Sequence, residues 1–504
     1  MPIGGITMSV AAEAAAPPPD ISSDSGSRRW LALAVIAVSQ LLIVLDATIV
    51  NIALPTAQTD LQISDANRQW MITAYTLAFG GFLLLGGRIA DYTGRKRAFI
   101  IGLLGFAAAS ALGGVAQNAG MLFSARALQG VFGALMAPAA LSLLTVTFTE
   151  AKERARAFGV YGAIAGGGGA VGLLLGGVLT EYASWRWTLL VSTPIAIVAA
   201  VAALRWVTES KAEGNTRYDL PGAITSTGGL VALVYGFTKA SSDGWGSSTT
   251  ISYLVIAVLL LVSFVVIELR SSHPLLPMRV ILDRNRGGAF LSALLIGVGM
   301  FGVFLFLTFY LQVTLGYSAL MTGVAFLPFT LGIIAGAGVS SQLNRFGPRT
   351  LMFSGLLMSA IGMALLTRIG VDTGFWTHVF PAELLISFGL GVTFGPMSNT
   401  ALVGVADHDA GVASALINTT QQIGGSLGTA LLNTIFTSAL ASYLTEHRDA
   451  LNPAGLQAVA TVHSYTVAFW VGAAAIGLAA VIALVLVRAS REEIAASDAL
   501  PVAV

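Results

Sequence analysis

Long apolar runs alternate with short polar stretches along almost the whole chain of 504 residues. A helix needs about 20 mostly apolar residues to cross about 30 Å of hydrocarbon, and the runs reach this length. The pattern therefore predicts an all-α polytopic membrane protein with fourteen spans. The spans are expected to start near Leu31, Met71, Ala98, Met121, Phe158, Trp187, Pro221, Ile251, Gly288, Thr322, Thr350, Val379, Gly411 and Tyr465.

The two halves of the chain carry similar segments at a nearly constant spacing. GRKRAFIIG (94–102) pairs with GPRTLMFSG (347–355), and GVYGAIAGGGGAVG (159–172) pairs with GVASALINTTQQIG (411–424). Parallel repeats of six spans are the architecture of secondary transporters that rock around a central site. The predicted organisation is a disordered cytoplasmic tail (1–29), an N-terminal six-helix bundle (30–210), two additional linking transmembrane helices (218–270), a C-terminal six-helix bundle (287–490) and a cytoplasmic tail (491–504).

Lys and Arg are unevenly divided between the two sets of loops. If the N-terminus is inside, nineteen of them fall on the inner side and five on the outer side, Arg68 among the five. Loops rich in Lys and Arg stay in the cytoplasm. We therefore expect both termini to be cytoplasmic and the protein to lie in the inner (cytoplasmic) membrane.

Composition narrows the possible functions. Only 10% of the residues are charged and the net charge is +1, which argues against nucleic-acid binding. The chain has no cysteine and its five histidines do not cluster, so no metal site is expected. No GxxxxGK[ST] loop is present, so nucleotide binding by that route is not expected. We expect no cofactor and no enzymatic activity, and a monomeric protein.

One acid interrupts the first apolar run. Asp46 lies fifteen residues after Leu31, about 22 Å along a helix, and an acid near the middle of a span costs about 2.5–3.5 kcal/mol. Such a group is a candidate for binding a proton when it is desolvated and releasing it when it is hydrated. The alternative is an Asp that hydrogen-bonds neighbouring spans, or caps one, without titrating.

Two further charged residues fall in or beside predicted spans. Arg126 lies about six residues into the fourth span. It is a candidate to hold an anion, pair with an acid or influence Asp46, and the alternative is snorkelling to the headgroups. Glu383 follows Pro381 near the outer end of the twelfth span, either as a second proton site or as an interfacial Glu in water.

Amide and aromatic side chains occur in spans that carry almost no formal charge. Such a lining suits amphipathic organic molecules better than sugars or phosphates, which need directed hydrogen bonds or fixed cations. Individual residues of this kind also serve in helix packing or lipid contact. The candidates for a substrate cavity are Asn51, Tyr75, Gln129, Phe309, Tyr310, Gln312, Asn399, Asn418, Gln421 and Gln422.

The loop GGRIADYTGRKR, residues 86–97, combines an acid, a glycine and three cations at a helix end. Gly94 would allow the chain to reverse tightly. From the residues alone, the loop could equally be an ordinary positive-inside loop. The loop resembles the G-x-L-A-D-x-x-G-R-K loop of the major facilitator superfamily, with Ile89 in place of Leu. The resemblance implies that Asp91 and Arg95, with Gly94 and Lys96 in the same loop, form a conformational gate.

Other segments resemble the fourteen-span drug:proton antiporter branch of that superfamily. LDATIVNIALP (45–55) is similar to its first-span motif, RALQGVFGA (126–134) to its fourth-span motif, and AGVASALINTTQQIGGSLGTALL (410–432) is typical of the branch. The resemblance implies proton-coupled efflux of amphipathic drugs or antibiotics by alternating access. The expected partners are protons, small amphipathic substrates and the lipid bilayer.

One motif departs from the branch. The antiporter signature G-x-x-x-G-P-x-x-G-G is represented by GGAVGLLLGG (168–177), which keeps Gly168, Gly172, Gly176 and Gly177 but has Leu173 in the proline position. The departure weakens the inference of exchange over symport. The alternatives are a substrate-specific symporter or exporter of the same fold, for a nutrient, lipid or siderophore, and a transport-inactive receptor.

Overall fold

The computed structural model describes residues 22–148, 150–211, 219–271, 274–405, 410–447 and 453–489, and these residues form helices without any β-strand. The predicted C-terminal tail and most of the predicted N-terminal tail lie outside these ranges. The first helix begins at Ser22, inside the segment expected to be a disordered tail.

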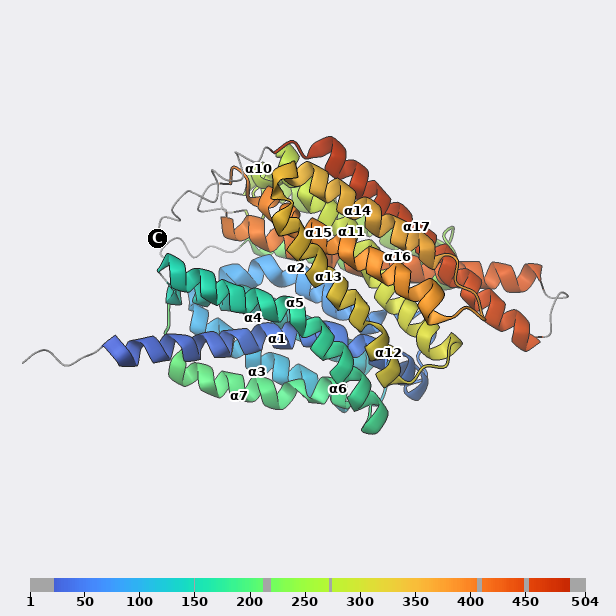
Figure 1. Cartoon of the computed structure of the whole chain (residues 1–504), viewed down its shortest axis with the longest axis horizontal. Coiled ribbons are helices and arrows are strands. Elements are labelled where there is room, and N and C mark those ends of the chain that lie inside the picture. The colour runs from blue at the N-terminus through green and yellow to red at the C-terminus, as the bar shows by residue number, and fades with distance from the viewer. Residues whose placement is uncertain are drawn as a thin grey trace, which may run out of the picture.

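The N-terminal half forms one bundle, drawn from blue to green in the lower part of Figure 1. Its helices are α1 (Ser22–Asp60), α2 (Trp70–Thr93), α3 (Arg95–Gly114), α4 (Ala119–Thr147), α5 (Ala151–Tyr182), α6 (Trp187–Leu190) and α7 (Ser192–Trp206).

The C-terminal half forms a second bundle, yellow to red in the upper part of Figure 1. Its helices are α10 (Met278–Ile281), α11 (Arg284–Phe309), α12 (Ala319–Ala325), α13 (Leu327–Gln342), α14 (Gly347–Leu366), α15 (Phe380–Leu402), α16 (Ala410–Glu446) and α17 (Pro453–Leu486). A π-helical turn, Tyr310–Thr314, continues α11.

Thirteen of the described helical segments are long and apolar enough to cross a membrane, and each coincides with a predicted span. The remaining predicted span, near Phe158, falls in the 32-residue helix α5, which is not among the thirteen. The all-α polytopic fold is thus confirmed, whereas the count of fourteen stays a prediction.

Helix α8 (Leu220–Asp243) connects the two bundles, and α9 (Ser248–Arg270) packs against α8. The Thr227 hydroxyl of α8 donates to the carbonyl of Gly81 in α2 at 3.3 Å. On the other side, the Thr434 hydroxyl of α16 donates to the carbonyl of Phe237 in α8 at 2.8 Å. Helix α8 therefore attaches to both halves, and α9 is held against α8.

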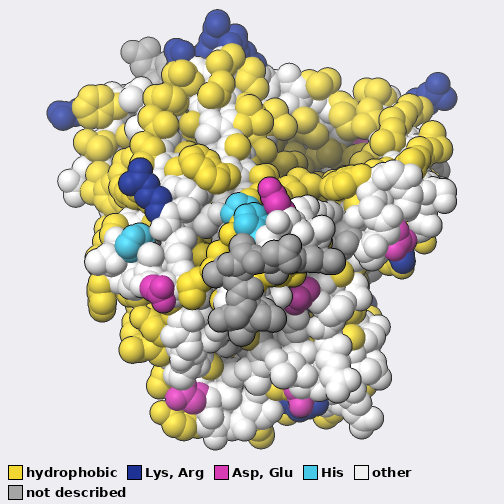
Figure 2. All heavy atoms as spheres, turned by 90° about the vertical axis from the view of Figure 1, so that its right-hand side faces the viewer, with side chains coloured by type: hydrophobic (Ala, Val, Ile, Leu, Met, Phe, Trp, Pro, Cys, Tyr) yellow, Lys and Arg dark blue, Asp and Glu magenta, His cyan; other side chains and the backbone are white. Residues whose placement is uncertain are grey.

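Polar contacts join the two bundles at the end where α1 stops and α2 begins. This end is called the outer end here, after the predicted orientation, and Figure 2 views it directly, with few charged side chains among apolar and neutral ones. The Gln312 side-chain amide donates to the carbonyl of Ile52 at 2.9 Å. The backbone amide of Leu320 donates to the Glu181 carboxylate at 2.9 Å. These contacts hold the outer end closed.

Candidate functional site

Asp46 and Arg126 form a buried ion pair inside the N-terminal bundle. Nη1 of Arg126 donates to Oδ2 of Asp46 at 2.6 Å, and the two side chains are 2% and 0% exposed. Arg126 also donates from Nε to the carbonyl of Met71 at 2.9 Å. The alternative of an Arg that snorkels to the headgroups is therefore wrong, because the guanidinium points into the bundle.

Other side chains complete this arrangement. Gln129 donates from Nε2 to Oδ1 of Asp46 at 2.9 Å and to the Ser110 hydroxyl at 2.8 Å, while its Oε1 accepts from Arg126 at 2.9 Å. The Arg126 guanidinium carbon lies 4.6 Å from the centre of the Tyr75 ring. These five residues, contributed by α1, α2, α3 and α4, are called the Asp46 cluster below.

The Asp46 cluster gives a buried carboxylate the partners that it needs. Two buried charges are tolerated only when they pair closely and their remaining hydrogen-bonding groups are satisfied. A proton that binds Asp46 would remove the negative charge and leave Arg126 without its counter-ion. Protonation of Asp46 would therefore act on the ion pair that joins α1 to α4.

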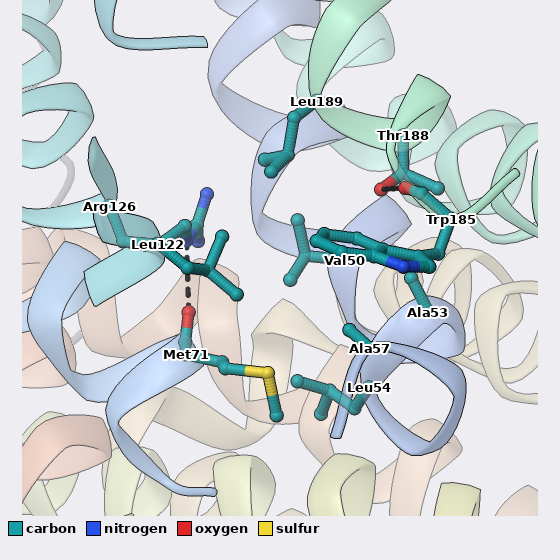
Figure 3. Close-up of a pocket in the computed structure, with 10 residues that line it drawn as sticks. All are labelled: Val50, Ala53, Leu54, Ala57, Met71, Leu122, Arg126, Trp185, Thr188 and Leu189. Atoms are coloured by element: carbon teal, nitrogen blue, oxygen red, sulfur yellow. Dashed lines mark hydrogen bonds between the residues drawn. The ribbon is translucent and has the colours of Figure 1, made fainter. Parts of the chain in front are cut away.

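A small pocket lies beside the Asp46 cluster (Figure 3). Its free volume, about 10 Å³, is close to the minimum that holds one water molecule. It is lined by Val50, Ala53, Leu54, Ala57, Met71, Leu122, Arg126, Trp185, Thr188 and Leu189. The pocket is far too small for a drug-sized molecule but reaches the guanidinium group.

Glu383 is a second buried acid, in the first turn of α15. Its side chain is 0% exposed, so the alternative of an interfacial Glu in water is wrong. Within the described part of the chain neither carboxyl oxygen has a hydrogen-bond partner. A buried carboxylate without partners is costly, and the group differs in this respect from Asp46.

The predicted gating loop folds back on its own bundle. Nε of Arg95 donates to Oδ1 of Asp91 at 2.9 Å. Gly94 has φ of 117°, a conformation that favours glycine. The carboxylate of Glu209, just beyond α7, accepts from the backbone amide of Lys96 at 3.0 Å, which satisfies one of the free N–H groups at the start of α3. Gating by this loop stays a prediction.

The side chains predicted to line one substrate cavity lie in several separate environments. Tyr75 and Gln129 belong to the Asp46 cluster, and Gln312 joins the bundles at the outer end. Phe309 is buried against the guanidinium of Arg68.

The other cavity candidates are equally dispersed. The Tyr310 hydroxyl donates to the carbonyl of Gly370 at 2.9 Å, and the Asn51 amide donates to the carbonyl of Ala47 in its own helix at 2.8 Å. Asn399 and Asn418 are exposed, and Gln421 and Gln422 are partly buried. Contact of these residues with a substrate stays a prediction.

Comparison with known proteins decides the family. Residues 36–429 match the Major Facilitator Superfamily. The chain belongs to this superfamily.

Several relatives within the superfamily are named for export or resistance. The chain is 52% identical over 469 residues to the puromycin resistance protein pur8 of Streptomyces alboniger, covering 92% of each chain. It is 39% identical to the cephamycin export protein CmcT of Amycolatopsis lactamdurans, over 80% of this chain and 84% of the relative. It is 33% identical to the multidrug efflux pump LfrA of Mycolicibacterium smegmatis, over 82% of each. Membership of a transporter family confirms that the chain is not an enzyme.

Two solved transporter structures share the fold. The POT family transporter PepTSo superposes with a TM-score of 0.67 at 15% identity, over 91% of this chain and 97% of that one. A bacterial homologue of the lysosomal transporter Spinster gives 0.62 at 17% identity, over 91% and 98%.

The glycines of the segment that resembles the antiporter motif bring α5 close to two other helices. Gly168, Gly172 and Gly176 face Val44, Thr48 and Ile49 of α1, and Gly177 faces Leu320 of α12. Small residues allow such close approach of membrane helices. Leu173, which stands where the motif has proline, has its carbonyl against Gly323 of α12. The residue that differs from the motif therefore lies where the two bundles meet.

Gly172→Ala is expected to destabilise the protein, because a Cβ there would collide with the Thr48 hydroxyl. Overpacking of this kind costs about 1–3 kcal/mol. The matched control is Gly169→Ala on the same helix, where the nearest atom, Cγ2 of Thr48, lies 3.9 Å from the added Cβ. Thermal unfolding of the purified proteins measures the difference. Equal midpoints for the two variants would show that α5 does not need this close contact.

Sequence reasoning missed several of these participants. Ser110 is one serine among many, and nothing in its surroundings marks it as a partner of Gln129. Glu209 follows the sixth predicted span as an ordinary loop acid, and only the fold brings it to the start of α3. Glu181 was likewise indistinguishable from other helix-end acids.

Proposed function

We propose that the protein exports amphipathic drugs or antibiotics across the cytoplasmic membrane in exchange for protons, by alternating access. The observation that carries this proposal is the buried pair of Asp46 and Arg126, an acid whose charge can be cancelled by one proton. The names of the relatives, which refer to resistance or export of puromycin and cephamycin and to multidrug efflux, support the direction and the substrate class.

Asp46 would couple proton binding to movement of the N-terminal bundle. When a proton neutralises the carboxyl group, Arg126 keeps its bonds to Met71 and Gln129 but loses its counter-ion. The attraction between α1 and α4 then weakens. Loss of the proton to the cytoplasm restores the ion pair, so each proton that passes resets the bundle.

The two ends of the molecule would alternate between closed and open. The contacts of Gln312 with Ile52 and of Glu181 with Leu320 favour a state that is closed at the outer end. In the opposite state we propose that the loop carrying Asp91 and Arg95 engages the C-terminal bundle and closes the cytoplasmic end. Both termini are placed in the cytoplasm in this scheme.

Glu383 would provide a second proton site in the C-terminal bundle. Its complete burial, with no hydrogen-bond partner among the described residues, favours a neutral carboxyl group in the outer-closed state. An open outer end would let the group take up a proton from outside, and hydration from the cytoplasmic side would then let it ionise and release the proton inward. Unlike Asp46, it is not paired with a cation in the described part of the chain.

Ethidium efflux from cells tests the proposal. Cells that express the protein are de-energised, loaded with ethidium and then given an imposed pH gradient, acidic outside. Export should begin with the gradient and stop when a protonophore collapses it, and cells without the protein give the background. Accumulation instead of depletion would indicate a symporter. No export across a panel of amphipathic compounds would indicate a receptor, and export of one narrow compound a dedicated exporter.

A further inference from the structure

Arg68 occupies an aromatic cage at the outer end. Its guanidinium carbon lies 4.4 Å from the centre of the Phe309 ring, 4.5 Å from that of Phe436 and 5.8 Å from that of Phe306. Tyr465 completes the group, its ring 5.1 Å from that of Phe436 and stacked on it. The Arg68 side chain is 3% exposed, although the charge count placed it in an outer loop.

The cage and its occupant belong to different bundles. The aromatic cage, defined as Phe306, Phe309, Phe436 and Tyr465, is built by α11, α16 and α17 of the C-terminal bundle. Arg68 comes from the connection between α1 and α2 of the N-terminal bundle. Separation of the bundles at this end would therefore withdraw Arg68 and leave the ring faces uncovered.

Ring faces and hydrogen bonds together hold the guanidinium, which also hydrogen-bonds the Tyr465 side chain. Nε donates to Oδ1 of Asn433 at 3.1 Å, while Nη2 is buried without a hydrogen-bond partner among the described residues. Nη1 lies 3.6 Å from the Asp65 carboxylate, whose side chain is 54% exposed. Aromatic faces attract cations most strongly when the cation is desolvated, and this cage provides such surroundings.

We propose that the aromatic cage is a binding site for an organic cation, such as the ammonium or phosphonium group of a transported compound, and that Arg68 is its built-in competitor. The proposal rests on the proposed function for the movement that empties the cage. When the outer end opens, the cage accepts the cationic group. When it closes, Arg68 returns to the rings and displaces the cation outward, which favours release over rebinding.

Binding of tetraphenylphosphonium to the purified full-length protein, measured by equilibrium dialysis, tests the site. Arg68→Met removes the competitor and loosens the outer contact, so binding should tighten about tenfold relative to wild type. Arg68→Lys keeps a cation in the cage and should leave binding near the wild-type level.

Phe309→Leu and Phe436→Leu, each combined with Arg68→Met, should weaken binding about three- to tenfold by removing one ring face. The matched control is Phe329→Leu, which alters a buried ring of α13 that packs on Phe304 at 5.1 Å, outside the cage. This variant should bind as its parent does. Neutral triphenylphosphine oxide should respond to none of these changes.

Three results would overturn the proposal. These are the absence of tetraphenylphosphonium binding by both wild type and Arg68→Met, equal effects of the cage and control variants, and a parallel loss for the neutral probe. If Arg68→Met is not monodisperse, the ring variants in the wild-type background decide in the same way. Binding needs no proton gradient, so a correct binding series without cellular export refutes the proposed function alone. If cells export ethidium but the variants do not change tetraphenylphosphonium binding as expected, the aromatic cage is refuted and the proposed function stands.

Discussion

Asp46→Asn is expected to reduce gradient-driven ethidium efflux to the level of cells that lack the protein. Asn keeps the shape of Asp and an acceptor for Arg126, but it carries no charge and cannot take up a proton. The variant should still exchange substrate for substrate across liposome membranes, because that exchange needs no proton. Efflux from energised cells with equal amounts of protein in the membrane measures the first effect, and labelled-substrate exchange measures the second.

The control for Asp46→Asn is Asp372→Asn, which neutralises an exposed acid in the connection before α15. It should export ethidium as wild type does. If Asp46→Asn also exported normally, Asp46 would serve only the packing of the N-terminal bundle. Glu383→Gln would then be the decisive variant, since Glu383 is, among the described residues, the other acid with a 0% exposed side chain.

Arg126→Met is expected to destabilise the protein strongly. The substitution leaves the Asp46 carboxylate buried without its counter-ion, and loss of one partner of a buried pair costs about 3–5 kcal/mol. Asp46→Asn combined with Arg126→Met removes both charges and should regain most of this stability, yet remain unable to couple efflux to protons. Thermal unfolding followed by tryptophan fluorescence, together with the efflux assay, separates the two effects.

Arg186→Met is a matched control for this experiment. Arg186 pairs with Asp60 at 2.6 Å, the same distance as in the buried pair, but the side chains are 33% and 45% exposed. Exposed pairs contribute about 0–1 kcal/mol, so this variant should unfold near the wild-type temperature. A similarly small effect of Arg126→Met would mean that Asp46 is already neutral in the resting protein.

The fold could be predicted from the sequence because hydrocarbon thickness imposes a minimum length on every span. The same physics singled out Asp46 and Arg126, since each is costly in an apolar run. Their pairing could not be derived. The two residues lie 80 positions apart on different helices, and no spacing rule gives the rotation of one helix relative to another.

Residues near the ends of spans were the least predictable. Arg68 and Glu383 fall where a run of apolar residues gives way to a loop, so water and protein are equally plausible surroundings. In the structure both are buried, because the connection before α2 folds inward and α15 begins inside the bundle. The predicted cavity residues proved to be dispersed for a similar reason. The sequence shows that an amide or an aromatic ring lies in a span, but not whether it faces a cavity, lipid or another helix.

The attachment of α8 to both α2 and α16 makes the molecule asymmetric about its long axis. In the alternating access proposed above, the bundles would stay connected on that side, and a relative rotation would have its axis there. The displacement is then largest along the other line of contact, where α5 meets α12 and α13, on the side that faces the viewer in Figure 1. In the proposed transport cycle the opening would widen toward this flank, which would border the acyl chains. Compounds dissolved in the bilayer could thus enter sideways, without first passing through water.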